Sequence, residues 1–236
     1  MNVKKTLPLI FLLAACSANA TEVKPYVSAF GGIDLGSKSD IYGHNPAGML
    51  RDIDVKYKSS FIYGLSVGAN VYQGPYGSIS AEFEYANRDL KTKSLSLNSV
   101  ERSLNGEKIN SLEINSYMAN VIYESNYIVD KLKYSMGAGI GLANMSYDVN
   151  YLVNNAATPT QINIKSTNNP LAYQFMVGLA YDFTENIAAL YNVKYFSVRD
   201  HNVNRYKLNN GPGLESVLNS GFDDSWSMNL GLRYTF

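Results

Sequence analysis

The segment that decides the fold is DSWSMNLGLRYTF, residues 224–236, at the end of the chain. From Trp226 onward every second residue is large and apolar, and the residues between them are small or polar. The apolar positions are Trp226, Met228, Leu230, Leu232, Tyr234 and Phe236. Because successive side chains of a strand point to opposite faces, the segment predicts a strand with one apolar face. That face would be the inside of a soluble sandwich or the lipid-facing outside of a membrane barrel.

The composition favours a single domain that meets both water and an apolar phase. Lys plus Arg and Asp plus Glu number 20 each, which gives no basic surface for nucleic acid. Charged residues make up 17% of the chain, below the roughly 25% typical of soluble domains. The 19 tyrosines point the same way, because this amphipathic side chain collects where apolar and wet regions meet.

The N-terminus has the three parts of an export signal. Lys4 and Lys5 precede the apolar run LPLIFLLAA, and the small residues ANA follow at 18–20. We therefore expect a signal peptide at 1–20 and a barrel domain at 21–236. As an alternative, LAAC at 13–16 resembles a lipoprotein signal in which Cys16 would be acylated. Cys16 is the only cysteine, so the mature fold has no disulfide in either case.

Period-2 segments recur along the rest of the chain and predict an all-β fold. We expect eight strands, near 23–34, 58–71, 77–90, 112–125, 131–147, 170–182, 187–199 and 224–236. Most of them reach the 9–11 residues that a tilted strand needs to cross a bilayer. In the first strand the pattern is ambiguous, with Val27 and Ala29 preferred as outward. Met118, Ile122, Leu190 and Phe196 are apolar residues on otherwise polar faces.

The connections alternate in length. Short ones lie at 73–77, 126–130 and 184–186, and long polar ones at 35–57, 91–111, 148–169 and 200–223. An up-and-down antiparallel barrel of outer-membrane type has short periplasmic turns and long extracellular loops. With eight strands, both chain ends fall on the periplasmic side.

A soluble sandwich would also have alternating strands, so the residues on the second face of each strand are needed to distinguish it from a membrane barrel. That face mixes charged residues with many Gly and Ser, whereas solvent faces are usually richer in long charged side chains. Small residues beside large ones suit the narrow interior of a small barrel. Together with the export signal and the connection lengths, this favours a transmembrane β-barrel.

The sequence resembles the small eight-stranded outer-membrane barrels of Gram-negative bacteria, the OmpX, OmpA-barrel and opacity-protein group. The resemblance rests on VKPYVSAFGGIDLG at 23–36, the repeated alternating strands and the terminal LGLRYTF. In that family a final Phe is recognised by the barrel-assembly machinery, which implies this role for Phe236. The resemblance also implies an outer-membrane location, contact with outer-membrane lipids, and a monomer.

For function, the resemblance implies a non-enzymatic surface barrel. Its loops would mediate adhesion, interaction with a host or neighbouring cell, or envelope integrity, although they could also be a mere solvated covering. The alternative is transport, through a narrow pore or an OmpW-like conduit for small molecules. Eight strands leave an interior just wide enough for side chains, so an open channel is not the default.

Inward-facing charges nearly balance, which suggests a buried ion-pair network that fills the lumen. The residues are Glu82, Glu84, Arg88, Glu124, Lys133, Asp182, Lys194 and Arg233. Unpaired charges would be expensive in such a space, although some of these residues could instead be solvated at the rims. Outward tyrosines are expected in two interfacial aromatic belts. They are Tyr63, Tyr85, Tyr117, Tyr123, Tyr173, Tyr181, Tyr191 and Tyr234.

Motifs for chemistry are weak. Lipid A deacylases carry His-x-Ser and a later Glu, whereas here His201 is followed by Asn202 and Val203, with Glu215 beyond. Asp200 beside His201 and the pair Asp223 and Asp224 are similar to acidic groups of barrel proteases, but such pairs in loops are usually solvated. With His44 and His201 as the only histidines, we expect no transition-metal site, no cofactor and no catalytic residue.

Overall fold

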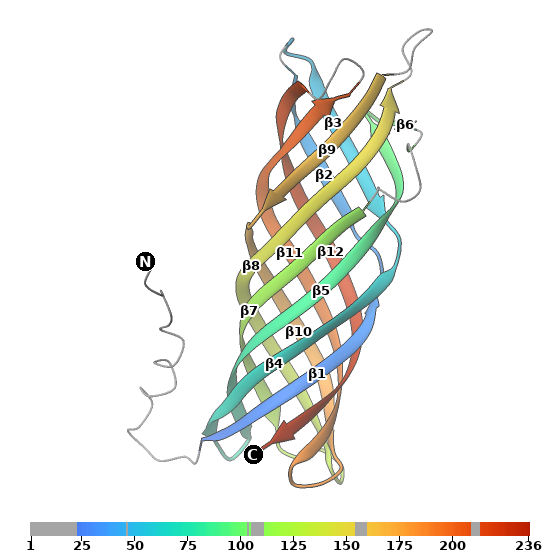
Figure 1. Ribbon diagram of the computed structural model, residues 1–236. Coiled ribbons are helices and arrows are strands. Elements are labelled where there is room, and N and C mark those ends of the chain that lie inside the picture. Colours follow the sequence, from blue (N-terminus) through green and yellow to red (C-terminus); the bar gives the residue numbers. More distant parts are fainter. Residues whose placement is uncertain (1–22, 46, 103, 105–110, 154–159, 209–212) are drawn as a thin grey trace, which may run out of the picture.

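The computed structural model describes residues 23–45, 47–102, 104, 111–153, 160–208 and 213–236, and they form a tall antiparallel barrel (Figure 1). The predicted signal peptide at 1–20, with Cys16, lies outside these residues. The strands are β1 Lys24–Asp34, β2 Lys38–His44, β3 Leu50–Tyr57, β4 Ser60–Gln73, β5 Gly77–Leu97, β6 Val100–Arg102, β7 Ser111–Ser125, β8 Leu132–Val153, β9 Thr160–Asn168, β10 Leu171–Asp182, β11 Ile187–Lys207 and β12 Gly213–Thr235. In the described part of the chain no helix has the length and apolarity to cross a bilayer.

Eight strands close into a ring at the end of the barrel that carries the short turns. Going round, the order is β1, β4, β5, β7, β8, β10, β11 and β12, and every neighbouring pair is antiparallel. The ring closes between the first and last strands, where Tyr26 lies opposite Thr235. A closed ring satisfies the backbone hydrogen bonds internally, as a membrane-spanning segment requires. The predicted eight-stranded up-and-down barrel is confirmed.

The strands continue well beyond this ring. β5, β8, β11 and β12 have 21 to 23 residues, about twice the 9–11 needed to cross a bilayer. Three other strands are interrupted at 35–37, 58–59 and 169–170 and resume as neighbouring strands. Beyond the breaks, β2, β3 and β9 take the places of β1, β4 and β10, again giving eight strands. We call the part below the breaks the membrane half and the part above them the extension.

The four connections predicted to be long are long, but the prediction that they are loops is wrong. Most of their described residues belong to strands rather than to irregular polar loops. The segment 38–57 is largely the β2–β3 hairpin, and β6, β9 and the distal ends of β5, β8, β11 and β12 account for most of the rest. The predicted strand ends near 90, 147 and 199 are consequently too early. These segments alternate too, but their apolar residues face inward, and polar or charged residues such as Asp54 and Lys56 face outward.

The polarity of the barrel inverts between its two halves, as β8 shows. In the membrane half Ile140 points outward and is 57% exposed, while glycines such as Gly139 face inward. A Cβ at Gly139 would overlap the Asn120 side chain, so glycine leaves room for the lumen residues. Past Leu142 the pattern reverses, and Met145 points inward with no exposed surface. The membrane half is thus apolar outside, and the extension is apolar inside like a soluble barrel.

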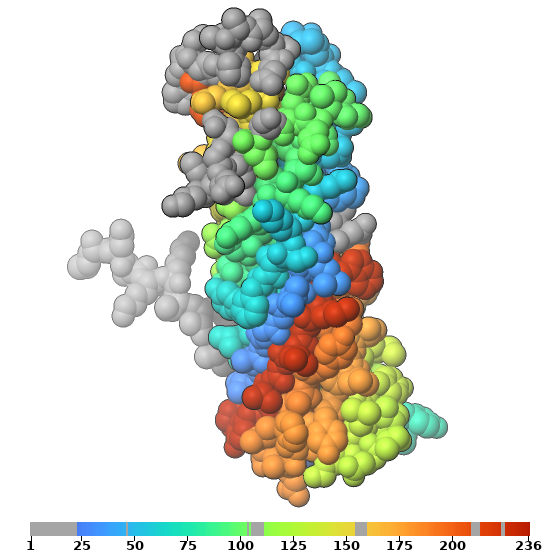
Figure 2. Space-filling view, turned by 90° about the vertical axis from the view of Figure 1, so that its right-hand side faces the viewer, coloured from blue at the N-terminus to red at the C-terminus, as the bar shows by residue number. Residues whose placement is uncertain are grey.

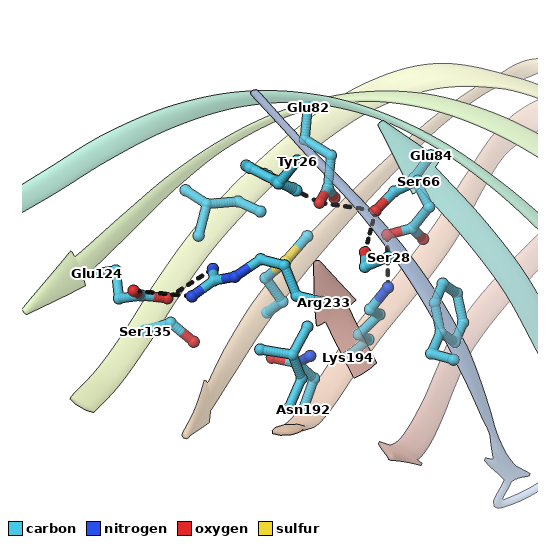
Figure 3. Close-up of a pocket in the computed structure, with 14 residues that line it drawn as sticks. Tyr26, Ser28, Ser66, Glu82, Glu84, Glu124, Ser135, Asn192, Lys194 and Arg233 are labelled. Atoms are coloured by element: carbon cyan, nitrogen blue, oxygen red, sulfur yellow. Dashed lines mark hydrogen bonds and ion pairs between the residues drawn. The ribbon is translucent and has the colours of Figure 1, made fainter. Parts of the chain in front are cut away.

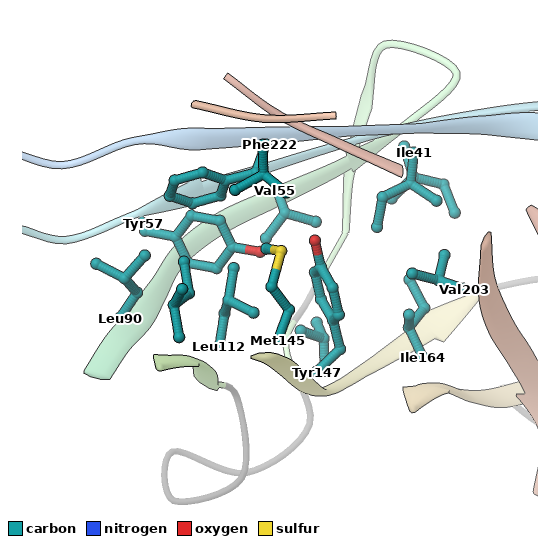
Figure 4. Packing of buried hydrophobic residues seen from close by; sticks show 14 of the residues in the cluster. Ile41, Val55, Tyr57, Leu90, Leu112, Met145, Tyr147, Ile164, Val203 and Phe222 are labelled. Carbon is teal, nitrogen blue, oxygen red and sulfur yellow. The ribbon is translucent and has the colours of Figure 1, made fainter. Parts of the chain in front are cut away.

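An apolar core fills the extension from wall to wall. Its members come from most strands of the upper ring, and Phe222 packs against Tyr57 with ring centroids 6.3 Å apart (Figure 4). From outside, diagonal bands of β1, β12 and β11 lie side by side on an elongated surface (Figure 2). About ten residues per strand, at ~3.3 Å each and tilted by about 45°, would raise the extension some 25 Å beyond the membrane half.

Candidate functional site in the barrel interior

The centre of the membrane half holds a buried ion pair between opposite walls of the barrel. Lys194 on β11 reaches Glu84 on β5 at 2.6 Å, and both side chains are almost wholly buried. The ammonium also lies 4.0 Å from the centre of the Phe30 ring. Because two charges have left water together, removing either partner would leave the other unpaired in a medium of low dielectric.

Beside this pair, Glu82 contacts only neutral hydrogen-bond donors. Tyr26 and Ser66 donate to its Oε2 at 3.1 and 2.8 Å, and Asn120 donates to its Oε1 at 3.0 Å. Gln174 in turn donates to Asn120 at 2.8 Å, so the network reaches across the lumen to β10. Figure 3 shows Tyr26, Glu82 and Ser66 converging next to the Lys194–Glu84 pair.

Near the short turns, a second group of charges occupies the lumen. Arg233 donates two hydrogen bonds to Glu124, at 2.8 and 3.0 Å, in the paired geometry that suits guanidinium and carboxylate (Figure 3). Lys133 lies 2.7 Å from Asp182 and 3.4 Å from Glu124. These side chains are 10 to 20% exposed, so this group sits closer to water than the central pair.

At the boundary with the extension, Arg88 is wholly buried beside Asp34, with 3.6 Å between its Nε and the carboxylate. Its guanidinium lies 4.1 Å from the centre of the Phe196 ring and donates to Ser116 at 3.2 Å. Asp34 also accepts a hydrogen bond from Ser225. Asp34 is the last residue of β1, so this cluster joins the break at 35–37 to the wall formed by β5.

The structure thus brings all eight predicted lumen residues to the interior and adds Asp34, which the sequence analysis missed. With Asp34 there are five carboxylates for four cations, and Glu82 is the one without a cationic partner among the described residues. Asp34 ends the one strand whose faces the sequence left ambiguous. It is the acid directly before the break, and it lies in register with Ser60 and Ser227. Whether the network holds the barrel together remains a prediction.

The cavity that lies among the lumen charges of the membrane half is small. A cavity of about 40 Å³ is lined by residues of both charged groups, among them Glu82, Glu124, Lys194 and Arg233 (Figure 3). A water molecule needs at least ~10–15 Å³ by this measure, so the cavity can hold only a few. Drug-sized ligands occupy pockets of at least about 300 Å³.

Within the extension, two tyrosines bring polar atoms into the apolar core. Tyr57 donates to Ser39 at 3.2 Å, and the hydroxyl groups of Tyr147 and Ser220 lie 3.1 Å apart. Burial raises the pKa of the Tyr147 hydroxyl to about 12, and it raises the pKa of Tyr57 as well. Both groups therefore stay neutral, and their hydrogen bonds offset the burial of polar atoms.

The eight tyrosines predicted for aromatic belts all lie on the outer face. Tyr85 and Tyr123 are half-buried and the other six are exposed. Ring contacts cluster near the two ends of the membrane half. Tyr85 packs on Tyr117 next to the extension, and Tyr181 packs on Phe183 beside a short turn, with centroids 5.4 and 5.5 Å apart. Their role as interfacial anchors stays a prediction.

Residues considered for chemistry do not assemble into a reactive group in the described structure. Glu215 forms an ion pair with Arg205, and Asp200 accepts a hydrogen bond from Tyr42 at 2.7 Å. None of the hydrogen bonds between described residues joins His201 to a carboxylate; its Nδ1 lies 3.2 Å from the Arg199 carbonyl oxygen. No group of three His, Cys, Asp or Glu is placed to hold a metal within the described ranges. The side chains of Asp223 and Asp224 lie outside the description.

His201 is expected to make the extension sensitive to acid. Burial lowers the pKa of its imidazole, although Asp200 and the Arg199 carbonyl oppose this effect. The unfolded chain, with a His pKa of ~6.5, would bind the proton more readily, so stability present above that pH should fall as the pH drops below it. We expect lower amide-exchange protection factors in β11 and β12 around His201 at about pH 5.5 than at about pH 7.5, on either side of that pKa, once each rate is corrected for the intrinsic pH dependence of exchange. His201→Gln should remove most of this difference; an unchanged difference would contradict it.

Neither a protein-family model nor a curated protein sequence matches the chain. Solved structures of outer-membrane barrels do match its fold. The outer membrane protein OprG from Pseudomonas aeruginosa has a TM-score of 0.61 at 14% identity, covering 91% of this chain and 95% of that one. A major outer membrane protein from Thermus thermophilus has a TM-score of 0.54 at 14% identity, covering 92% and 100%. The outer membrane protease OmpT from Escherichia coli has a TM-score of 0.51 at 10% identity, covering 91% and 97%.

The fold is that of an outer-membrane β-barrel. A closed ring with an apolar outer band and a polar interior spans a membrane, and single-chain barrels of this kind are components of the bacterial outer membrane. The identities are too low to carry more than the fold, and the three structures include a protease. They therefore bear on the architecture of this chain but not on its activity.

Proposed function

We propose that this protein is a closed, non-enzymatic surface barrel whose extension presents a recognition surface to a ligand on a host or neighbouring cell. The observation that carries this proposal is the filled interior. Polar side chains occupy the membrane half, and an apolar core with essentially no exposed surface occupies the extension. A filled barrel serves as a rigid support, and rigid supports commonly present recognition residues at their ends.

The end of the extension carries apolar side chains that are exposed to water. Met49 and Leu50 in the β2–β3 hairpin and Leu214 and Val217 at the start of β12 are each 50 to 58% exposed. β12 pairs with β2, so the start of β12 lies beside the β2–β3 hairpin. Apolar groups gathered on a water-facing surface favour contact with a partner over a mere solvated covering.

An adhesion assay tests this surface. Cells that display the wild-type barrel should bind host or neighbouring cells, and a variant with Met49, Leu50, Leu214 and Val217 replaced by Ser should bind several-fold less. A control variant replaces Asp89, Lys165 and Asn202, exposed residues on the sides of the extension, by Ala. Equal adhesion by all three proteins would contradict the proposal. Detergent sensitivity on deletion, with adhesion unchanged, would instead assign a role in envelope integrity.

The filled interior also disfavours the transport alternative, a narrow pore or an OmpW-like conduit. Ions would have to pass both the Lys194–Glu84 pair and the apolar core around Phe222. We expect refolded protein to give no stable unitary conductance in planar-bilayer recordings. Reproducible single-channel steps would show that the lumen opens and would favour transport.

A further inference from the structure

Four lysines gather on one side of the barrel where the extension begins. Lys56 ends the run of outward residues on β3, Lys58 lies in the break at 58–59, and Lys91 and Lys93 lie on β5. The backbones of two of them are joined directly, because the Lys58 amide donates to the Lys91 carbonyl at 2.8 Å. A register shift between β3 and β5 places Lys93 next to Lys56. All four side chains are exposed, and we call them the lysine patch.

The lysine patch lies directly beyond the lipid-facing surface. Three residues after Lys58, Phe61 is 63% exposed and stacks on Tyr63, with centroids 6.2 Å apart. On β5, the outward residue Tyr85 precedes Lys91 by six residues and packs on Tyr117. Aromatic side chains of this kind mark the level of lipid headgroups. The ammonium groups therefore lie at the height of the outer-leaflet headgroups.

The lysine patch keeps a net positive charge, because nearby acidic residues do not neutralise it. Lys38, the cross-strand neighbour of Lys56, pairs with Asp40 at 3.0 Å, but none of the four patch lysines belongs to an ion pair among the described residues. Two acids, Asp54 and Asp89, lie two residues away along the same faces. Against four lysines, they leave an excess of positive charge.

The patch also occupies only one sector of the barrel. On the two strands that follow β5, the outward residues in register with Lys91 are Ser111 on β7 and Asp148 on β8. If these lysines served solubility alone, similar lysines would be expected on all sides of the barrel. A local excess of ammonium groups at headgroup height fits a negatively charged headgroup held at this sector.

We propose that the lysine patch binds the phosphate groups of a phosphorylated glycolipid in the outer leaflet. Ammonium groups on flexible stems suit phosphate as compact point charges. Below them, the exposed side chains of Phe61, Tyr63 and Leu65 offer an apolar surface for the acyl chains of the same lipid. Because charge and apolar contact adjoin, a lipid fits this site better than a soluble polyanion. The inference rests on the membrane orientation and is independent of what the tip of the extension binds.

Lipid retention by purified barrels tests the proposal. Wild-type protein in phosphatidylcholine nanodiscs would be exposed to lipid A and, separately, to dephosphorylated lipid A, phosphatidylglycerol, inorganic phosphate and a soluble sulfated polysaccharide. Native mass spectrometry would count the bound lipid. We expect retention of lipid A, about tenfold weaker binding after replacement of the four lysines by Gln, and similar weakening when the phosphates are removed.

A control of equal charge change replaces Lys24, Lys165, Arg199 and Lys207 by Gln, since these exposed residues lie away from the patch. It should retain lipid A at the wild-type level. Heat-modifiable gel migration of both variants shows that they fold. The proposal is overturned if the patch variant retains lipid A like wild type, if the control loses it equally, or if sulfated polysaccharide or inorganic phosphate is retained as well as lipid A. None of these outcomes affects the adhesion assay with the variant in which Met49, Leu50, Leu214 and Val217 are replaced by Ser.

Discussion

Glu84→Gln is expected to lower the free energy of unfolding by about 3–5 kcal/mol, because it leaves the buried ammonium of Lys194 without a counter-charge. Glu84 and Lys194 are 3% and 4% exposed and lie 2.6 Å apart, so water cannot replace the lost carboxylate without opening the barrel wall. Urea unfolding in lipid vesicles would measure the change. Trp226, the only tryptophan, faces outward and reports insertion by its fluorescence.

Glu82→Gln is the matched control. The two glutamates are two residues apart on the same face of β5, but Glu82 contacts only neutral donors. An amide can keep part of these hydrogen bonds, so we expect a loss of no more than about 1 kcal/mol. The double variant Glu84→Gln with Lys194→Met should regain much of the stability lost by Glu84→Gln alone. Equal losses for Glu82→Gln and Glu84→Gln would show that charge pairing does not organise the lumen.

Phe222→Ala is expected to cost about 3–5 kcal/mol in the extension, as for other large-to-small changes in a packed core. Phe222 has no exposed surface and lies between Tyr57 and Phe196, with centroids 6.3 and 6.2 Å away. Because β12 carries it beyond the membrane half, the damage should be local. Proteases added to whole cells should cleave the variant in the extension while the membrane half stays protected.

Leu214→Ala supplies the comparison, since Leu214 lies on the same strand but is 58% exposed. We expect this variant to resist protease as wild type does. If Phe222→Ala were equally resistant, the apolar core of the extension would not be what holds its strands together.

The sequence predicts the membrane half well because one physical rule applies throughout it. Large apolar residues face lipid, so alternation locates the strands, and Val27 and Ala29 are exposed as expected. The same rule fails above the breaks, where the apolar residues turn inward. Of the four exceptions noted on polar faces, Met118 and Phe196 are buried members of the apolar core cluster, whereas Ile122 and Leu190 line the cavity of the membrane half. In the sequence, Met118 and Phe196 already indicate that the inward face of a strand becomes apolar toward the extension.

The interior was predicted as a set of residues but not as a set of partners. Alternation places Glu82 and Glu84 on the same face, yet only closure of the barrel brings Lys194 from a strand 110 residues away to one of them and not to the other. Asp34 was missed because Gly31 and Gly32 obscure the faces of β1. Such pairings depend on register and on barrel diameter, which local sequence does not encode.

The inverted extension also limits how anything outside the cell can recognise this protein. Every second residue of its strands is buried, so a binding partner contacts only alternate side chains. These side chains come from segments as far apart in sequence as β2 and β12. An antibody against a linear peptide such as 38–57 would need contacts that the folded surface conceals. Immune recognition of the intact cell should therefore depend on conformational epitopes that cross several strands.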